Sequence, residues 1–381
     1  MKFALPLARL TETVGIVSRA VAGKNIRPIL ANLLISVRGN EAQFVGTDME
    51  IMMISRLPAT VEVEGHFTIP ARLLHEVVNG FVPSSDQDVV SFETIAPVEG
   101  LVAPTVVRLQ TGRIHYDLQI QGIEDYPPVP SLEGETFPRF DIESAALKKG
   151  LREAAIAMAT EEANPTQRSI CMNFQGHGEI ILVATDSKRL AVTAIPKVTH
   201  PPEFNGTYLV PARTVPELMK LLDESEKINV GLYHRQLVFT TKKFQLLSRL
   251  IDGKFPDYNR VLPKEYSRRL TVRRKDFLQA IRTVTPIARH SSQMVRLDIG
   301  PNEMRVWAES REEGLSESFV PVKLEGEPIN IAFNGSYLSD FLNVLDEEET
   351  VMDMTTPSYP GVLKSGKGEG KFVYVLMPMS Y

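Results

Sequence analysis

Apolar residues recur along the chain with helical spacing, and the same pattern occurs three times. Residues 69–81, 210–222 and 333–345 place apolar side chains in the same four columns, at relative positions i, i+3, i+4 and i+7. This spacing puts the apolar side chains on one face of an α-helix. A second segment with helical periodicity stands near the start of each repeat, at 9–21, 146–158 and 276–288. The pattern therefore predicts two helices in each of three repeats.

Each repeat also contains a strand, a tight turn, a second strand and a proline. The three copies are 42–58, 179–196 and 303–321. The turn falls at Thr47 in the first copy and at Thr185 in the second, 138 residues later. Solenoid repeats run roughly 20–50 residues, so each unit here is a domain. We predict an α+β fold of three similar domains, each with two helices packed on antiparallel sheets. Proline-rich segments predict the boundaries 1–128, 129–263 and 264–381.

The composition is that of a well-packed globular chain. The 381 residues are 43% apolar and 23% charged, and their net charge is −5. The chain as a whole therefore lacks the positive charge of a nucleic-acid binder. The single cysteine, Cys171, excludes an intrachain disulfide, and a cytoplasmic location is expected. No apolar stretch is long enough for a membrane span or for the core of a signal peptide.

The sequence gives little support for catalysis or metal binding. The seven histidines lack H-x-x-x-H spacing, and neither a phosphate loop ending in Gly-Lys-Ser/Thr nor a G-x-S-x-G motif occurs. Asp48 and Asp186 follow threonines at equivalent turns, but the third repeat has Glu309 there. A structural turn is therefore favoured over an acid–base role. We predict no catalytic residue, no cofactor and no metal; an enzyme that uses Asp48 or Asp186 is the third hypothesis.

Positive charge gathers around the first helix of the repeats. Residues 264–296 hold nine lysines and arginines against two acidic residues, and the equivalent helix of the second repeat carries Lys148, Lys149 and Arg152. Such a lining neutralises phosphates without reading bases. No aromatic residues alternate with these cations, as single-strand binding requires, so a nucleic-acid duplex is the expected ligand. A solvated charged face without a ligand is the alternative, and the pattern alone leaves both open.

Several motifs resemble the DNA polymerase III β subunit family, the bacterial sliding clamps. In chain order they are MKF, RPILANLLI (27–35), GTDMEI (46–51), VATDSKRLAV (183–192), VPARTVPELMKLL (210–222), LIDGKFPDYNRVLP (250–263), FNGSYLSDFLNVL (333–345) and YVLMPM (374–379). The resemblance covers the whole chain. It implies the DNA clamp fold, in a ring-shaped homodimer whose helices line the hole. It also implies a non-catalytic processivity factor that encircles duplex DNA, slides along it and tethers polymerases and repair factors.

Simple geometry agrees with a dimer. A domain of ~127 residues is about 36 Å across, so six domains in a ring leave a hole of about 36 Å. Three domains leave a hole of only about 6 Å, too narrow for duplex DNA about 20 Å wide. A single chain is therefore not expected to encircle DNA.

The resemblance implies a peptide-binding pocket between the second and third domains. Its expected residues are Cys171, Thr185, Lys188, Arg189, Leu190, Pro256, Arg260, Val261, Asn334, Tyr337, Val375, Met377, Pro378 and Met379. The apolar C-terminal tail then serves both as the last strand and as a pocket wall. Its methionines suit a surface that accepts many peptides, because the thioether chain is flexible and polarisable. Cys171 departs from the family pattern, since a larger aliphatic residue is common there, and Lys188 adds a cation beside the peptide path.

Other roles follow from the resemblance together with the basic pattern. DNA contacts are expected at Lys24, Arg72, Lys148, Lys149, Arg152, Arg213 and Arg282. The seam between two chains is expected to join Tyr116 and Leu118 of the first domain to Pro286 and Ile287 of the third. The implied partners are duplex DNA of any sequence, replicative and repair polymerases, a clamp loader and a second copy of the chain, with no membrane. The alternative function is a three-domain peptide-binding scaffold that does not encircle DNA.

Overall fold

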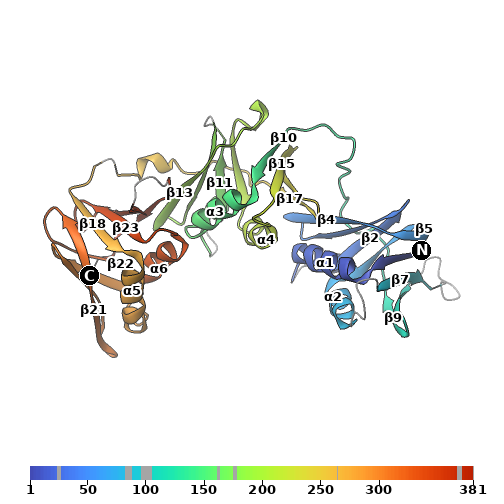
Figure 1. Ribbon diagram of the computed structural model, residues 1–381, viewed down its shortest axis with the longest axis horizontal. Helices are drawn as coiled ribbons and strands as arrows, with labels where there is room; N and C mark the ends of the chain where they lie inside the picture. Colours follow the sequence, from blue (N-terminus) through green and yellow to red (C-terminus); the bar gives the residue numbers. More distant parts are fainter. Residues whose placement is uncertain are drawn as a thin grey trace. The chain divides into compact units, whose positions relative to one another are not determined.

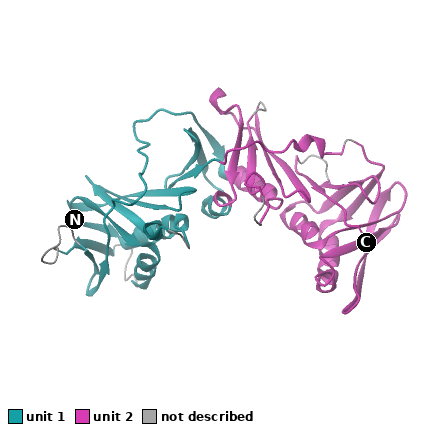
Figure 2. Cartoon of the chain, turned by 180° about the vertical axis from the view of Figure 1, so that it is seen from behind, with its two compact units in different colours: residues 1–144, 216–250 teal, residues 145–215, 251–381 magenta. Residues whose placement is uncertain are grey.

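The computed structural model describes residues 1–23, 27–81, 88–95, 105–160, 164–174, 178–263, 265–366 and 371–380. Within these ranges the chain forms six α-helices and three antiparallel sheets (Figure 1). It divides into two compact units, Met1–Ser144 with Pro216–Leu250, and Ala145–Val215 with Ile251–Tyr381 (Figure 2). The division passes through the middle repeat, so residues of this repeat belong to both units.

The first unit contains two sheets. The five-stranded sheet has the order β5 (Thr60–Val63), β1 (Lys2–Pro6), β7 (Val89–Thr94), β8 (Val106–Thr111) and β9 (Ile114–Gln119). The eight-stranded sheet has the order β10 (Arg139–Glu143), β15 (Lys227–Tyr233), β16 (Gln236–Thr240), β17 (Gln245–Arg249), β4 (Ile51–Pro58), β3 (Glu41–Thr47), β2 (Asn32–Arg38) and β6 (Gly65–Pro70). Because β17 pairs with β4, strands of the first and second repeats share one sheet.

The second unit contains one sheet of twelve strands. Its order is β14 (Thr207–Pro211), β11 (Ser169–Asn173), β12 (Glu179–Thr185), β13 (Arg189–Pro196), β25 (Val373–Leu376), β24 (Gly361–Ser365), β23 (Glu349–Met354), β18 (Arg268–Arg273), β21 (Gly314–Glu325), β20 (Glu303–Ser310), β19 (Met294–Ile299) and β22 (Ile329–Asn334). Here β25 pairs with β13, and this pair joins the third repeat to the second.

The six helices fall where the apolar periodicity predicts them. They are α1 (Leu7–Val17), α2 (Ala71–Gly80), α3 (Ser144–Ala155), α4 (Thr214–Leu221), α5 (Arg274–Ala288) and α6 (Gly335–Val344). In the first unit α1 contacts α2, β3 and β4, and in the second α5 contacts α6, β20 and β21. The prediction of two helices in each repeat, packed on antiparallel strands, is confirmed.

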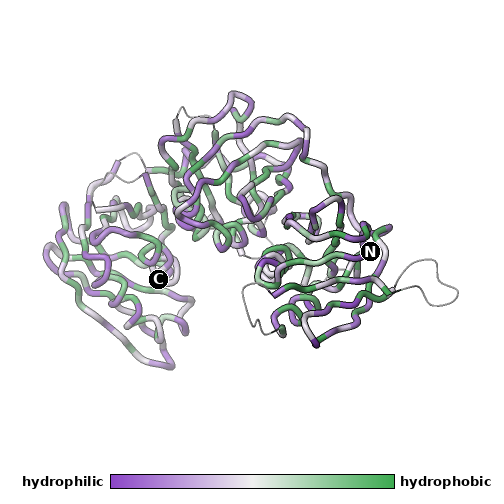
Figure 3. Tube along the Cα trace, turned by 45° about the vertical axis from the view of Figure 1, so that its right-hand side comes forward, coloured by the Kyte–Doolittle hydropathy of each residue, from purple (hydrophilic) through white to green (hydrophobic). Residues whose placement is uncertain are grey.

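Helix α1 illustrates how the pattern produces burial. Leu10 and Val14 are 0% exposed, and both lie on the face that packs against the sheet. Full burial of such a side chain contributes about 2 kcal/mol. Hydrophobic and hydrophilic stretches alternate along the chain in both units, as the colouring of Figure 3 shows. Helix packing thus accounts for part of the core of each unit. Further buried apolar clusters, which include Leu247 in the first unit and Val375 in the second, consist of residues from strands and from the segments that link the repeats.

Candidate functional site

A tight turn between β12 and β13 forms one wall of the candidate site. The Asp186 carboxylate accepts hydrogen bonds from the backbone N–H groups of Lys188 and Arg189, both at 2.9 Å. The Thr185 hydroxyl donates to the Arg189 carbonyl oxygen at 2.8 Å. Ser187 takes a left-handed φ of 72°, which a tight turn of this kind requires. Asp186 therefore holds the turn together, as predicted for a structural aspartate.

Arg189 fixes this turn to the start of α6. Its side chain is only 9% exposed and donates to the carboxylates of Asp186 at 3.0 Å and Asp340 at 2.6 Å. The guanidinium carbon lies 3.9 Å from the centre of the Tyr337 ring, a cation–π contact. Burial alone would lower the pKa of Arg189, but the Tyr374 hydroxyl and the two carboxylates outweigh it and raise the pKa. The arginine is thus a permanent cation with few alternative positions.

A cavity of about 250 Å³ opens beside this turn, and we call it the tail pocket. Its lining residues are Gln167, Thr185, Ser187, Arg189, Leu190, Pro256, Asp257, Tyr258, Val261, Val375 and Met377. The C-terminal segment reaches the cavity because Val375 pairs with Leu190 across the sheet. The Met377 N–H then donates to the Lys188 carbonyl oxygen at 2.9 Å. Met377 remains 42% exposed, so the pocket presents an apolar surface to solvent.

A buried apolar cluster supports the floor of the tail pocket. Cys171 packs there with Val183, Leu190 and Val375, and it is 2% exposed. Burial raises the pKa of the Cys171 thiol to about 12, so the thiol stays protonated and unreactive at neutral pH. Cys171 does not reach the cavity surface, which differs from the expected place in the pocket wall. The reason is that partly buried side chains, among them Tyr258 and Leu262, pack against the cluster that holds Cys171.

Seven of the residues that the sequence predicts for a peptide-binding pocket line this cavity. The predicted residues that line the cavity are Thr185, Arg189, Leu190, Pro256, Val261, Val375 and Met377. Other predicted residues lie nearby but are not part of the lining: Lys188, Arg260, Asn334, Tyr337, Pro378 and Met379. Asn334 caps α6, since its side-chain oxygen accepts from the Ser336 N–H at 2.9 Å and the Tyr337 N–H at 3.3 Å. Arg260 pairs with Asp257 at 3.0 Å and is 85% exposed.

Four lining residues were not predicted: Gln167, Ser187, Asp257 and Tyr258. Ser187, Asp257 and Tyr258 stand inside the motifs that carry the family resemblance, so the signal for them was present in the sequence. Gln167 stands outside those motifs and reaches the turn by donating from Nε2 to the Ser187 hydroxyl at 2.6 Å. No periodicity or motif indicates this contact, because it joins segments that are separate along the chain.

The expected DNA-contacting cations differ in how strongly they are already paired. Arg72 has a side chain that is 93% exposed and forms a helical ion pair with Glu76 at 2.9 Å. Such exposed pairs are weak and exchange readily. Arg282 is exposed on α5 and donates to the Asn343 side chain at 3.2 Å. These two arginines keep most of their charge available to a ligand.

Lys149 and Arg152 share one carboxylate instead of facing solvent alone. Lys149 lies 3.1 Å and Arg152 lies 2.8 Å from the carboxylate of Asp346. Burial alone would raise the pKa of Asp346, but hydrogen bonds from both cations lower it. Lys148 and Arg213 are partly buried, and Lys24 lies outside the described residues. The local charge of this predicted group is therefore smaller than the sequence suggests.

The residues expected at a seam between chains are exposed to different degrees. Tyr116 on β9 is 37% exposed, whereas Leu118 on the same strand is 7% exposed and offers little surface to a partner. Pro286 is exposed and Ile287 partly buried on α5. Larger apolar surfaces that were not predicted lie at Ile114 on β9, 50% exposed, and at Leu315 and Phe319 on β21, 53% and 54% exposed. Strand alternation does not reveal them, because it does not tell which strand edges stay open.

Two further classes of site find no support in the described part of the chain. No helix there is long and apolar enough to cross a membrane. Within the same residues, no group of three or more His, Cys, Asp or Glu side chains is placed to hold a metal ion. The candidate sites are therefore the tail pocket, the cations and the open strand edges.

Comparisons with known proteins agree with these features. Family models match three consecutive segments: the N-terminal domain of the DNA polymerase III beta subunit at residues 1–130, the central domain at 141–257 and the C-terminal domain at 259–380. The beta sliding clamp of Vibrio cholerae is 28% identical over 382 residues, covering all of both chains.

Solved structures give the same result. The sliding clamp of Bacillus subtilis is 26% identical with a TM-score of 0.90, over 100% of this chain and 99% of that one. The sliding clamp of Bartonella birtlesii, solved bound to griselimycin, is 27% identical with a TM-score of 0.90 over all of both chains. The predicted clamp fold is thus confirmed. With domain matches along nearly its whole length, the chain belongs to the DNA polymerase III beta subunit family.

Proposed function

We propose that two copies of this chain close into a ring around duplex DNA and hold polymerases through the tail pocket. The chain is a DNA polymerase processivity factor, because its family and its full-length relatives are sliding clamps. We further propose how the ring closes and which surfaces contact DNA and partner peptides. We also propose that the chain breaks no bonds itself. The observation that carries it is a strand pairing that joins neighbouring repeats. This pairing occurs twice within the chain, and it leaves the two equivalent strands of the first and third repeats, β9 and β21, without such a partner.

Neighbouring repeats are joined each time by the same kind of strand pair. In the first unit, the last strand of repeat two, β17, pairs with β4, the strand after the turn of repeat one. In the second unit, β25 of repeat three pairs in the same way with β13 of repeat two. Two equivalent strands then remain: β9, the last strand of repeat one, and β21, the strand after the turn of repeat three. Among the described strands, β9 pairs only with β8, and residues 314–320 of β21 pair only with β20.

These two open edges are apolar, which supports their pairing between chains. Ile114 and Tyr116 on β9 are 50% and 37% exposed, and Leu315 and Phe319 on β21 are 53% and 54% exposed. An open strand edge with exposed apolar side chains promotes association unless a partner covers it. If β9 of each chain pairs with β21 of the other, two identical head-to-tail joints close a six-domain ring. The hole of such a ring is about 36 Å wide, enough for duplex DNA.

The remaining surfaces suit binding without chemistry. Cations such as Arg72 and Arg282 neutralise phosphates and read no base, as sliding requires. Asp186 and Asp48 are engaged by backbone N–H groups of their own turns, which supports a structural role and argues against an acid–base one. A closed ring cannot thread onto circular DNA, so the proposal includes a separate clamp loader that opens the seam.

The tail pocket is proposed to bind short extended peptides of polymerases and repair factors. Alternate side chains of an extended peptide point to the same side, so two apolar residues separated by one position reach the pocket together. Leu190, Val375 and Met377 supply the apolar surface that such side chains bury. We infer that peptides of the type Gln-Leu-x-Leu-Phe bind there.

Sedimentation equilibrium at micromolar concentration tests the ring. The expected mass is about 85 kDa, twice the 42.5 kDa of one chain. Ile114→Asp is expected to shift the mass to 42.5 kDa, because it places a charge in the proposed seam. Val63→Asp is the matched control, since Val63 is 52% exposed on β5, the opposite edge of the same sheet. A monomeric unmodified chain, or equal loss of dimer in both variants, contradicts the proposed seam.

Retention on DNA then separates a sliding clamp from a peptide scaffold. After loading, the dimer is expected to stay on nicked circular plasmid and to leave when a restriction enzyme linearises it. A ring held by topology is lost only through DNA ends, whereas a scaffold without encirclement binds circular and linear DNA equally. Equal retention on both forms would favour the scaffold.

A further inference from the structure

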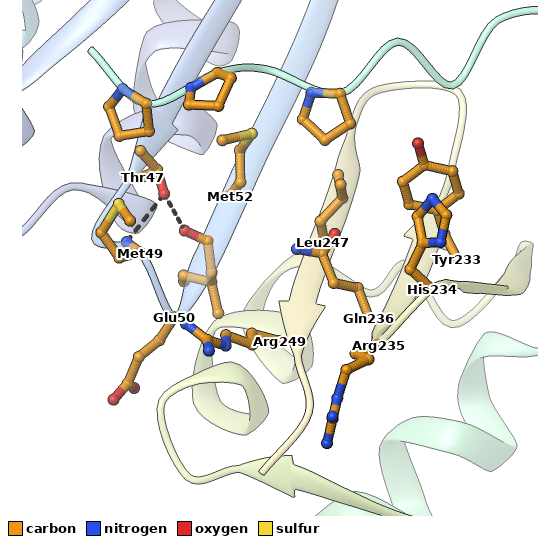
Figure 4. Close-up of a pocket in the computed structure, with 14 residues that line it drawn as sticks. Thr47, Met49, Glu50, Met52, Tyr233, His234, Arg235, Gln236, Leu247 and Arg249 are labelled. Carbon is orange, nitrogen blue, oxygen red and sulfur yellow. Dashed lines mark hydrogen bonds between the residues drawn. The ribbon is translucent and has the colours of Figure 1, made fainter. Parts of the chain in front are cut away.

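A second cavity, of about 430 Å³, lies in the first unit, and we call it the proline pocket (Figure 4). Its lining residues are Thr47, Met49, Glu50, Ile51, Met52, Pro127, Pro128, Pro130, Tyr233, His234, Arg235, Gln236, Leu247 and Arg249. Three prolines come from the segment at the boundary between the first and second repeats. Figure 4 shows Met52 and Leu247 between this segment and the arginines Arg235 and Arg249.

The proline pocket is built from the same parts as the tail pocket. The Thr47 hydroxyl donates to the Ile51 carbonyl oxygen at 2.7 Å, as the Thr185 hydroxyl donates to the Arg189 carbonyl oxygen in the second repeat. Met49 takes a left-handed φ of 79°, as Ser187 does at the equivalent position. The Arg249 N–H donates to the Glu50 carbonyl oxygen at 2.9 Å. This bond matches the one from Met377 to Lys188, because Glu50 and Lys188 are 138 residues apart.

The strand register extends the correspondence to the pocket floors. Leu247 pairs with Met52 across β17 and β4, as Val375 pairs with Leu190 across β25 and β13. Each pocket therefore combines a threonine turn, an apolar strand pair and a proline-containing linker. Two cavities with the same backbone frame are expected to accept the same kind of backbone, an extended peptide.

The side chains around the proline pocket favour a different peptide sequence. Where the tail pocket has Met377, the proline pocket has Arg249, an exposed cation whose side chain contacts no acceptor among the described residues. Arg235 adds a second positive charge. Glu50 is the one residue of the lining that carries a carboxylate. The amide oxygen of Gln236 is buried and has no hydrogen-bond donor within the described residues. A backbone N–H of a bound segment is the donor that such a group lacks.

We propose that the proline pocket is a second peptide-binding site, for a short extended segment of a partner protein that carries an acidic residue beside apolar side chains. The apolar side chains contact Met52 and Leu247. The carboxylate lies against Arg249, which a charge-assisted hydrogen bond fixes in place. A backbone N–H of the segment donates to Gln236. The charge at position 249, where the tail pocket has the uncharged Met377, makes this site prefer acidic segments.

Methionine-methyl NMR of the full-length chain tests this inference, because each pocket contains its own reporters. Met49 and Met52 line the proline pocket, and Met377 lines the tail pocket. The probe is the acetylated and amidated peptide Asp-Leu-Ser-Leu-Phe, with Asn-Leu-Ser-Leu-Phe as its uncharged counterpart. The acidic peptide is expected to shift the Met49 and Met52 signals in a saturable way. The uncharged peptide is expected to bind the proline pocket about tenfold more weakly, since it lacks the charged contact.

A pair of charge reversals provides the control. Arg249→Glu is expected to weaken the acidic peptide at least tenfold as seen by Met49 and Met52. Arg38→Glu makes the same change on an exposed arginine of the first unit that does not line the cavity, and it is expected to leave binding unchanged. Unaltered signals of the remaining methionines verify that both variants fold.

Three results overturn the inference: shifts confined to Met377, shifts that do not saturate, or equal weakening by Arg249→Glu and Arg38→Glu. The proposed role of the tail pocket is tested separately with the peptide Gln-Leu-Ser-Leu-Phe. If that peptide does not bind there, the NMR signal of the Met377 methyl group does not shift. The second site does not depend on that outcome, because Met49 and Met52 report it alone.

Discussion

Truncation of Met377 to alanine is the most direct test of the tail pocket. Met377 is 42% exposed at the cavity, and its backbone N–H, which donates to the Lys188 carbonyl oxygen at 2.9 Å, is kept in alanine. The variant therefore removes apolar surface without moving the chain. We expect weaker binding of a peptide such as Gln-Leu-Ser-Leu-Phe and unchanged folding.

The size of the effect follows from the exposed area. A bound peptide that covers the exposed part of Met377 removes roughly 70 Å² of apolar surface from water, which is worth about 1.7 kcal/mol at ~25 cal/mol per Å². Alanine keeps a small part of this contact, so the expected loss is about 1.5 kcal/mol, or roughly tenfold in Kd. A larger loss is not expected, because the Leu190 and Val375 surfaces stay in place.

Fluorescence anisotropy with the labelled peptide measures the change in Kd. Leu73→Ala is the matched control, because it truncates a large apolar side chain that is 39% exposed in the first unit and lines neither pocket. Circular dichroism of both variants checks that the fold is retained. A change of less than twofold in Met377→Ala, or an equal loss in Leu73→Ala, would refute the assignment of the tail pocket.

Two further predictions concern stability. Asp353 is 3% exposed and accepts from Arg269 at 2.7 and 2.9 Å and from Lys364 at 3.0 Å. Burial alone would raise the pKa of Asp353, but these hydrogen bonds lower it below the ordinary 3.8. The ionised carboxylate therefore stabilises the folded chain above pH 3.8, and this stabilisation is lost as the pH falls through the folded-state pKa. Asp353→Asn should lower the free energy of unfolding by about 2 kcal/mol near pH 7; the loss is moderate because Arg269 and Lys364 are each one-third exposed. Thermal melts at about pH 7 and about pH 3 measure this, and the stability difference between the unmodified chain and Asp353→Asn should be smaller at the lower pH. Gly46→Ala should cost about 2 kcal/mol or more, because the added Cβ would lie 2.3 Å from a backbone carbonyl oxygen; Gly23→Ala, with open space around it, should have little effect on the same melts.

The local features of this protein were readable from the sequence. Apolar spacing placed all six helices, and the Thr-Asp turns at Asp48 and Asp186 occur where the repeat comparison put them. These features depend on contacts between residues a few positions apart, so their pattern is written in consecutive residues. The motifs around them were specific enough to indicate the clamp family before any contact was known.

The tertiary structure decided which of these local features meet. The pairing of β17 with β4 and of β25 with β13 creates both pockets, and the pairing of β11 with β12 brings Gln167 to the tail pocket turn. Asp346 takes up charge from Lys149 and Arg152, and the fold buries Leu118, although the sequence indicated an exposed role for all three. Sequence patterns report the period of an element, but strand edges, shared carboxylates and burial depend on which segments of the chain meet in the folded structure. That is why the helices and turns were predictable, while the second pocket and the open edges of β9 and β21 became visible only in the folded chain.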